Sequence, residues 1–208
     1  MKLEVLNIKG EKTGRSVQLA DEIFGIEPND HVLYLDVKRY QINQRQGTHK
    51  AKERNELKGS TRKLRKQKGG GGARIGDIKS PLLRGGGRIF GPRPRNYDIK
   101  LNQKEKVIAR KSALSYKSKE NKIIVLENFD IDTPKTKEYI SILGALNIGD
   151  QKSLLVLQNR QENIIRSARN IEGANVVISS DLNSYNIMYN STLILTEDAV
   201  KSINDTLK

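Results

Sequence analysis

Residues 44–97 constrain the fold of this chain more than any other segment, because they hold 16 Lys and Arg against three acids, Glu53, Glu56 and Asp77. This stretch carries +13 of the net charge of +14. It also contains 11 of the 17 glycines, and its apolar residues are widely separated. Such a segment cannot bury enough apolar surface to offset the entropy that it loses on ordering. We call it the arm and expect it to order only against a partner with many negative charges.

The remainder of the chain is far closer to neutral. Residues 98–119 add seven bases against two acids, and residues 1–43 and 120–208 together count 15 bases against 19 acids. About 150 residues outside the arm are enough for one core of ordinary size. We therefore expect a single globular domain, made of residues 1–43 and 98–208, with the arm inserted in it at 44–97.

Composition and the first residues narrow the cellular setting. The chain has no cysteine, which excludes disulfides and thiolate chemistry and fits a reducing cytosol. The segment Met1 to Asn7 is too polar for a secretory signal, and no apolar run approaches the roughly 20 residues of a membrane span. Glycines at 69–72 and 85–87 would break a basic helix lying on a membrane surface. We expect a cytoplasmic protein with no membrane partner.

The first 43 residues predict a strand pair followed by an ambiguous stretch. Apolar residues alternate from Leu3 to Ile8, a turn follows at Gly10 to Gly14, and alternation resumes at Val17, which is typical of two strands at a sheet edge. The residues from Asn29 to Ile42 fit a helix or a strand by periodicity. Asn29 as an N-cap favours the helix.

After the arm the pattern becomes helical. Asn102 and Glu105 have the spacing of a capping box, and the helix that they begin would turn Val107, Ala113 and Leu114 inward. We expect four bases to face outward on it, Lys104, Arg110, Lys111 and Lys117. They are either a solvated face or a second contact for an anion, and the sequence leaves both interpretations open.

The last 90 residues alternate strands and helices. Continuous apolar runs at 123–126, 154–157, 176–178 and 193–195 are separated or followed by helical stretches that begin with Thr133 as cap and Pro134, near 162–171, near 184–189 and at Thr196. Continuous apolar strands with helical connections are typical of a parallel sheet covered on both faces. We predict an α/β fold of three layers, a mostly parallel sheet flanked by helices, with the long basic loop leaving between two helices of one layer.

No pattern predicts catalysis, a cofactor, a metal or a small-molecule substrate. The glycines do not satisfy G-x-G-x-x-G, and Gly10 to Ser16 lacks the spacing and the lysine of a P-loop. His31 and His49 have no spaced partner of the metal or triad type. Asp130 and Asp132 precede Thr133-Pro134, so we interpret them as the acidic entry to a helix rather than as metal ligands.

The arm itself has the chemistry of a nucleic-acid ligand. Five bases lie within 62–68, directly before four glycines, so phosphate neutralisation is combined with close approach of the backbone. The segment 85–91 repeats this pattern and adds Phe90, which is available to stack. Pro92 and Pro94 alternate with arginines, as in an extended segment that follows a polyanion. The arginine content, suited to bidentate contacts, argues against a disordered solubilising tail.

The arm favours RNA over DNA as its partner. No helix-turn-helix, zinc finger or basic zipper is present, and an irregular arm rich in Gly and Arg cannot easily read a duplex major groove. Folded RNA instead offers crevices, unstacked bases and 2′-hydroxyls.

The ordered set of residues in and after the arm resembles the L-four family of bacterial large-subunit ribosomal proteins (uL-four), over essentially the full chain. The matching positions are Arg45 to Thr48, Lys52, Arg54, Lys63, Gln67 to Gly69, Gly71, Ala73, Arg74, Gly76, Ser80, Pro81, Gly85 to Gly87, Gly91 to Arg95, Tyr97 and Ala109 to Ser115. A colinear set of this kind is far more specific than any single glycine motif.

The resemblance implies a structural constituent of the large ribosomal subunit, located in the cytoplasm, that organises large-subunit (23S-type) rRNA during assembly and contacts neighbouring ribosomal proteins. Its loop tip would line the polypeptide exit tunnel. It implies a helix for Asn29 to Ile42, RNA contacts from 45–58 on the way out, and contacts from 88–95 on the return. The full expected set of rRNA-binding residues is Arg45, Lys50, Lys52, Arg54, Lys58, Arg62, Lys63, Arg65, Lys66, Lys68, Arg74, Lys79, Arg84, Arg88, Arg93 and Arg95. The tip nearest the tunnel would lie within 62–74, at Arg65, Lys66, Gln67, Lys68, Gly69, Gly70, Gly71 and Gly72.

The chain departs from the family pattern at this tip. Leu64-Arg65 stands where the family usually has Pro-Trp, so an aromatic platform is replaced by a guanidinium that can also stack. Gly70 and Gly72 replace more usual Thr and basic residues, and Asp77 stands where a small hydroxyl residue is common. An alternative function is a free RNA-binding regulator or chaperone, including one that controls its own operon messenger.

Overall fold

The computed structural model describes residues 1–207, and these form two compact units. The first comprises Met1–Gln41 and the residues from Lys100 onward, and the second comprises Ile42–Ile99. Within residues 1–207, no helix has the length and apolar character needed to cross a membrane.

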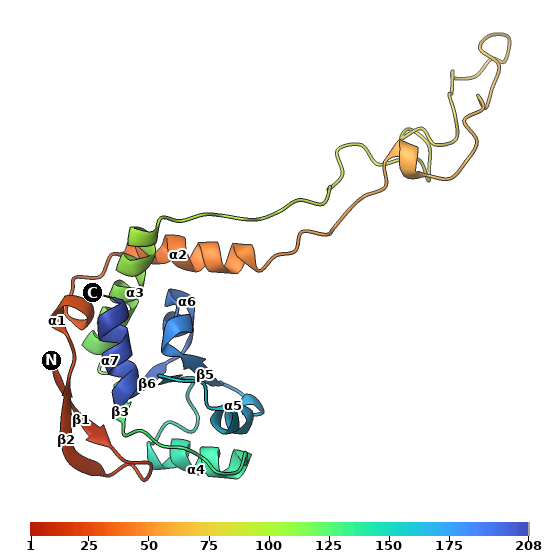
Figure 1. Ribbon diagram of the computed structural model, residues 1–208. Coiled ribbons are helices and arrows are strands. Elements are labelled where there is room, and N and C mark those ends of the chain that lie inside the picture. Colours follow the sequence, from red (N-terminus) through yellow and green to blue (C-terminus); the bar gives the residue numbers. More distant parts are fainter. Residues whose placement is uncertain (208) are drawn as a thin grey trace. The chain divides into compact units, whose positions relative to one another are not determined.

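A single six-stranded sheet organises the first unit (Figure 1). In spatial order its strands are β2 (Lys12–Gln18), β1 (Lys2–Leu6), β3 (Ile123–Leu126), β6 (Thr192–Thr196), β4 (Ser153–Leu157) and β5 (Ala174–Ile178). The β1–β2 pair is antiparallel, whereas every other neighbouring pair is parallel. The expected edge hairpin and the mostly parallel sheet are both confirmed.

Helices connect the strands and cover the sheet. They are α1 (Asp21–Phe24), α2 (Asp30–Asn43), α3 (Gln103–Lys119), α4 (Thr136–Ala145), α5 (Glu162–Arg169), α6 (Ser184–Tyr189) and α7 (Glu197–Thr206), with 3₁₀ turns η1 (Arg54–Glu56) and η2 (Ser179–Asp181). The stretch from Asn29 to Ile42 is therefore helical, and Asn29 caps it by accepting a hydrogen bond from the Val32 amide at 3.1 Å. Glu105 likewise accepts a 3.2 Å bond from the Asn102 amide at the start of α3, as the capping-box spacing predicts.

Two hydrophobic cores lie on opposite faces of the sheet. On β4, Leu154 and Val156 join a core with side chains of α1, α2, α3, α6 and α7, whereas Leu155 and Leu157 join a second core with α4 and α5 (Figure 1). This alternation explains the continuous apolar runs, because both faces of each central strand are buried. The expected three-layer α/β domain is confirmed.

The predicted start of α4 is wrong. The helix begins at Thr136 with Lys135 as N-cap, and Thr133-Pro134 lies in the bend before it. The preceding segment is held against α5, where the Asn163 side chain donates to the carbonyls of Ile131 at 2.8 Å and Asp132 at 3.1 Å. Asp132 lies four residues before the first helical residue and Asp130 lies six before it, so the expected acidic entry does not adjoin the helix.

The expected outward orientation of Lys117 is also wrong. Its side chain is only 5% exposed, and its Nζ donates to the Ser191 carbonyl at 3.2 Å. Lys117 follows Ala113 and Leu114 by four and three positions, so it lies on their buried face of α3. Burial lowers the pKa of this ammonium group. Lys104 is exposed and Arg110 and Lys111 are partly exposed, so the outward face of α3 has one base fewer than expected.

Candidate nucleic-acid interface

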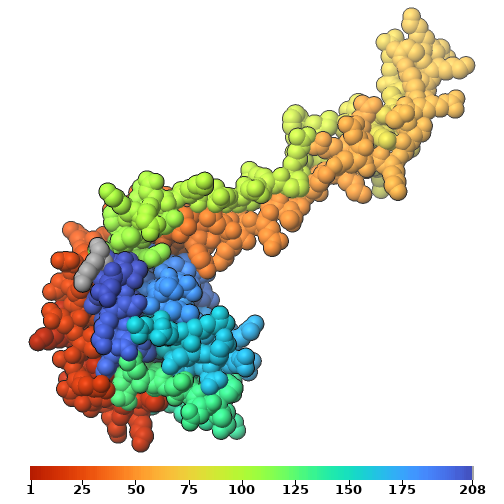
Figure 2. Space-filling view, viewed as in Figure 1, coloured from red at the N-terminus to blue at the C-terminus, as the bar shows by residue number. Residues whose placement is uncertain are grey.

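The second unit begins and ends at a closed base. The side-chain Nδ2 of Asn43 donates to the Ile99 carbonyl at 3.2 Å, and the backbone amide of Ile99 donates to Asn43 Oδ1 at 2.9 Å. Farther along, the Arg95 amide donates to the Gly47 carbonyl at 3.2 Å, and the Ala51 amide donates to the Pro92 carbonyl at 3.0 Å. These bonds keep the outgoing and returning segments of the arm side by side (Figure 2).

Tyr97 contacts two cationic side chains near these two ends of the arm. The guanidinium of Arg95 lies 4.4 Å from its ring centroid and that of Arg45 lies 6.0 Å away, so both make cation–π contacts. Gly47 permits this packing: it has φ +62, and a Cβ placed on it would lie 2.1 Å from the Arg95 carbonyl oxygen. Two of the expected RNA-binding arginines are thus fixed by one half-buried aromatic ring.

The outgoing and returning segments of the arm contact each other midway along it, around η1. The Glu53 amide donates to Glu56 Oε2 at 3.3 Å, and the Arg88 amide of the returning segment donates to the Lys52 carbonyl at 2.9 Å. Gly87 is buried against η1, where a Cβ would lie 2.4 Å from the Arg54 amide nitrogen. Only glycine fits this crossing of the two segments.

The three acids of the arm each pair with one of its bases. Glu53 pairs with Arg93, Glu56 with Lys50, and Asp77 with Arg54 at 2.7 Å. The hydrogen bond from Lys50 lowers the pKa of Glu56, and the hydrogen bond to Glu53 raises the pKa of Arg93. Asp77 is only 5% exposed, and its Oδ1 has no hydrogen-bond partner among residues 1–207. The acids are thus paired inside the arm, and its other bases have no acidic partner among the residues that the structure describes.

The expected RNA-binding residues gather in four places along the arm. All are exposed except Lys79, which is half-buried. Arg45 and Arg95 flank Tyr97; Lys50, Lys52, Arg54, Arg88 and Arg93 surround η1; Lys58, Arg62, Lys63, Lys79 and Arg84 line a hollow; and Arg65, Lys66, Lys68 and Arg74 belong to the tip. Apart from the three pairs above, none has a carboxylate partner within the part of the chain that the structure describes.

The tip is a loop of exposed residues. A hydrogen bond from the Leu64 amide to the Gly76 carbonyl, 2.9 Å long, closes it. Residues 65–74 then line a cationic concavity, with Gly69 at φ +82 and Gly71 at φ +62 providing its turns. Gln67 accepts a hydrogen bond from Lys63, and the other expected tip residues face solvent.

Phe90 is the most exposed large apolar side chain of the arm. It also has φ +52, a left-handed conformation that is strained for a bulky residue. Ile89 beside it is more than half exposed. An aromatic ring held away from any intramolecular contact is available to a ligand, which fits the stacking role that its position predicts.

Sequence reasoning missed the apolar members of the arm that lie close together, Leu57, Leu64 and Ile78. They are single residues among bases and glycines, so neither period 2 nor period 3.6 marks them. It also missed the Arg54–Asp77 pair, whose members are 23 positions apart. Among residues 1–207, no group of three His, Cys, Asp or Glu side chains could hold a metal ion. The ring of His49 lies 6.5 Å from the Tyr97 ring, measured between centroids.

A doubly covered α/β domain that carries an inserted unit with this surplus of unpaired cations is the arrangement expected of a protein that binds a polyanion. Residues 17–206 match the Ribosomal protein L4/L1 family, and the chain belongs to this family. It is 60% identical to the large ribosomal subunit protein uL4 of Phocaeicola vulgatus over 207 residues, covering 100% of both chains. It is 58% identical to uL4 of Parabacteroides distasonis over the whole of both chains, and 53% identical to uL4 of Flavobacterium johnsoniae over 100% of this chain and 99% of the relative.

Proposed function

We propose that this chain is a structural protein of the large ribosomal subunit, that its arm binds and organises large-subunit rRNA during assembly, and that the tip of the arm lines the polypeptide exit tunnel. Its relatives are named as large ribosomal subunit proteins, and the family consists of structural components rather than enzymes. We expect the chain in the bacterial cytoplasm, within the large subunit and in contact with neighbouring ribosomal proteins.

The observation that carries the RNA-binding part of the proposal is the disposition of charge in the arm. Its three acids are engaged in internal pairs, while almost all of its bases are exposed and directed at solvent. A solvated charge run has no need of internal pairs that hold its two segments together. A backbone of alternating cations, glycines and prolines with fixed crossings fits a crevice of folded RNA.

The proposal assigns different work to different parts of the chain. The domain of residues 1–43 and 98–208 supplies a self-sufficient core, and the arm at 44–97 supplies the contacts with RNA. The unpaired bases on 45–58 contact RNA on the outgoing segment, and the unpaired bases on 88–95 contact it on the return. The residues within 65–72 form the part nearest the tunnel, where Arg65 offers a planar stacking group in place of an indole.

Salt extraction of ribosomal particles tests the proposal. The intact chain should co-sediment with large subunits and remain through salt washes, because an embedded arm is held by geometry as well as by charge. A purely electrostatic binder loses roughly 10³ or more in affinity over a fourfold increase in salt. A chain that leaves in the first wash would instead be a free RNA-binding regulator, and a chain absent from the particles would overturn the proposal.

The matched variant for this test removes residues 62–72. The hydrophobic cores of the first unit draw no residue from this segment. The shortened chain should therefore unfold with the same cooperativity, still sediment with large subunits, and alter the tunnel wall, which chemical probing of tunnel nucleotides would detect.

A further inference from the structure

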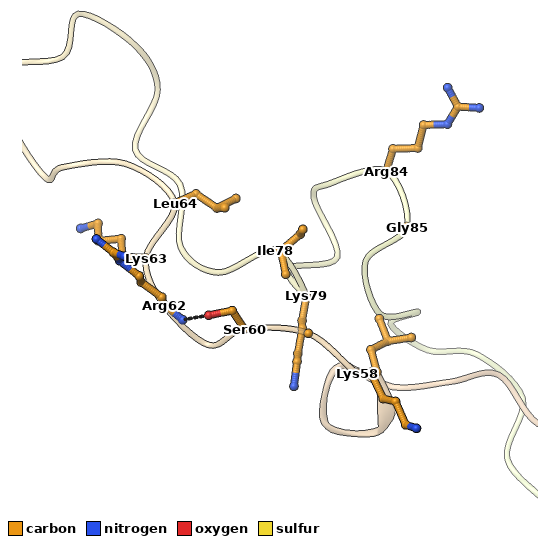
Figure 3. Close-up of a pocket in the computed structure, with 11 residues that line it drawn as sticks. Lys58, Ser60, Arg62, Lys63, Leu64, Ile78, Lys79, Arg84 and Gly85 are labelled. Atoms are coloured by element: carbon orange, nitrogen blue, oxygen red, sulfur yellow. Dashed lines mark hydrogen bonds between the residues drawn. The ribbon is translucent and has the colours of Figure 1, made fainter.

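A hollow of about 680 Å³ lies within the arm, between the outgoing residues 57–64 and the returning residues 78–85 (Figure 3). It is distinct from the concavity of the tip at 65–74. Its volume falls in the range of roughly 300–1,000 Å³ that small-molecule sites occupy. All of its lining residues belong to the second unit.

The floor of this hollow is apolar and uncovered. Leu64 and Ile78 are each 50% exposed, and Leu57 is half-buried beside them. Figure 3 shows the Leu64 side chain directed toward Ile78 across the space between the two segments. Gly59 packs against Ile78, since a Cβ on it would lie 3.2 Å from Ile78 Cγ2. Isolated apolar side chains of this size gain free energy when a flat apolar ligand covers them.

All the charged residues that line the hollow are cationic, and we call them its rim. Five bases line it, Lys58, Arg62, Lys63, Lys79 and Arg84, and no lining residue is acidic. In Figure 3 the side chains of Lys58, Lys79 and Arg84 extend away from the space between Leu64 and Ile78, so their charged groups lie outside the apolar floor. The neighbouring acid, Asp77, is buried and bound to Arg54. The turn that carries Arg62 is fixed by a 3.1 Å hydrogen bond from its amide to Ser60 Oγ.

We propose that this hollow holds a single unstacked nucleotide of RNA, with the base lying over Leu64 and Ile78 and the adjoining phosphates bound by the rim. The inference rests on the proposed function and names the ligand of one part of the arm. A duplex cannot enter a space of this size, whereas a single nucleotide combines a flat base for the apolar floor with phosphates for the cationic rim. Folded RNA presents unstacked bases whose charge lies on the flanking phosphates, which is the arrangement of floor and rim.

The test distinguishes the contribution of the apolar floor to RNA binding from that of the charged rim. Large-subunit rRNA is titrated with the full-length chain and with the double variant Leu64→Ala, Ile78→Ala, at several salt concentrations. The matched control is Leu82→Ala, because Leu82 is an apolar residue of the same segment, 93% exposed, and is not part of the hollow. The double variant should bind about tenfold more weakly, which corresponds to about 1.4 kcal/mol, with no change in the dependence on salt. The control should bind like the original chain.

Two further measurements make the result decisive. The variant Leu64→Met, Ile78→Leu keeps an apolar floor and should restore binding, which excludes a merely altered path of the arm. Chemical probing should show one nucleotide that gains reactivity in the alanine variant and not in the control. If the alanine variant binds like the control, or loses salt dependence as a charge variant does, the nucleotide site is refuted while RNA binding by the arm stands. If no chain shows salt-dependent binding, the proposed function itself fails.

Discussion

The internal ion pairs of the arm predict which charges contribute to RNA binding. Lys52 and Arg88 are exposed, have no carboxylate partner among residues 1–207, and lie on one hydrogen-bonded step of the two segments. Lys50 lies two positions from Lys52 but is paired with Glu56. The double variant Lys52→Gln, Arg88→Gln therefore removes two free cations, whereas Lys50→Gln, Glu56→Gln removes a neutral pair from the same region.

Counterion release gives the magnitude of the difference. Each phosphate contact on single-stranded nucleic acid contributes about 0.7 to the slope of log K against log salt, so two lost contacts reduce that slope by about 1.4. Over a fourfold change in salt, such as about 50 to 200 mM, the binding constant of the Lys52, Arg88 variant should fall about sevenfold less than that of the original chain. The Lys50, Glu56 variant should keep the original slope.

Filter binding of large-subunit rRNA over this salt range measures both slopes. Far-UV circular dichroism controls for the fold, and no change is expected, because all four side chains are at least partly exposed and lie outside the hydrophobic cores of the first unit. Equal losses of slope in the two variants would show that Lys50 leaves Glu56 and contacts phosphate on binding. That result would refute the reasoning that the acids of the arm are held in internal pairs.

Three further predictions follow from particular residues. Gly47→Ala should open the base of the arm and speed amide exchange at Arg95, whereas Gly71→Ala, with the same φ of +62 and no atom within 4 Å of an added Cβ, should not; equal effects would mean that φ strain alone matters. Phe90→Ala should weaken rRNA binding by about 1–3 kcal/mol and Phe90→Trp should restore it in the same titration, while unchanged binding by the alanine variant would exclude stacking. Burial lowers the pKa of Lys117 in the folded chain below its ordinary value of 10.5. Between these two pKa values the unfolded chain holds a proton that the folded chain has lost, so the free energy of unfolding should rise with pH over this range. Lys117→Met, which keeps the buried aliphatic stem, should abolish this contribution in urea unfolding curves, and an identical pH dependence in both proteins would contradict it.

Much of the α/β domain could be predicted because its signals are local. Continuous apolar runs predict strands buried on both faces, and Asn29 and Asn102 cap helices through bonds within three residues. The start of α4 could not be predicted, because Asn163 holds the preceding segment through bonds that span 31 and 32 positions. The buried position of Lys117 depends in the same way on a carbonyl at Ser191, 74 positions later.

The same distinction between local and long-range interactions decides which parts of the candidate site could be predicted. Composition alone identifies the bases of the arm, since charge requires no knowledge of distance. It cannot identify which bases are neutralised, because Arg54 and Asp77 lie 23 positions apart and Arg93 and Glu53 lie 40 apart. It also cannot join Leu64 to Ile78, which form one floor only because the two segments of the arm run side by side.

The three acids of the arm thus have a different role from its 16 bases. Glu53 and Asp77 each join residues that lie far apart along the arm, and together with Gly47 and Gly87 they determine where the outgoing and returning segments cross. An arm of bases alone would have to be folded entirely by its polyanion, against the full loss of chain entropy. Crossings made beforehand reduce that loss, and under our proposal they hold the hollow at 57–64 and 78–85 open for a nucleobase while the unpaired cations remain available to phosphate. With the proposed RNA partner, we therefore expect specific placement to depend on the acids that fix these crossings as well as on the bases that bind phosphate.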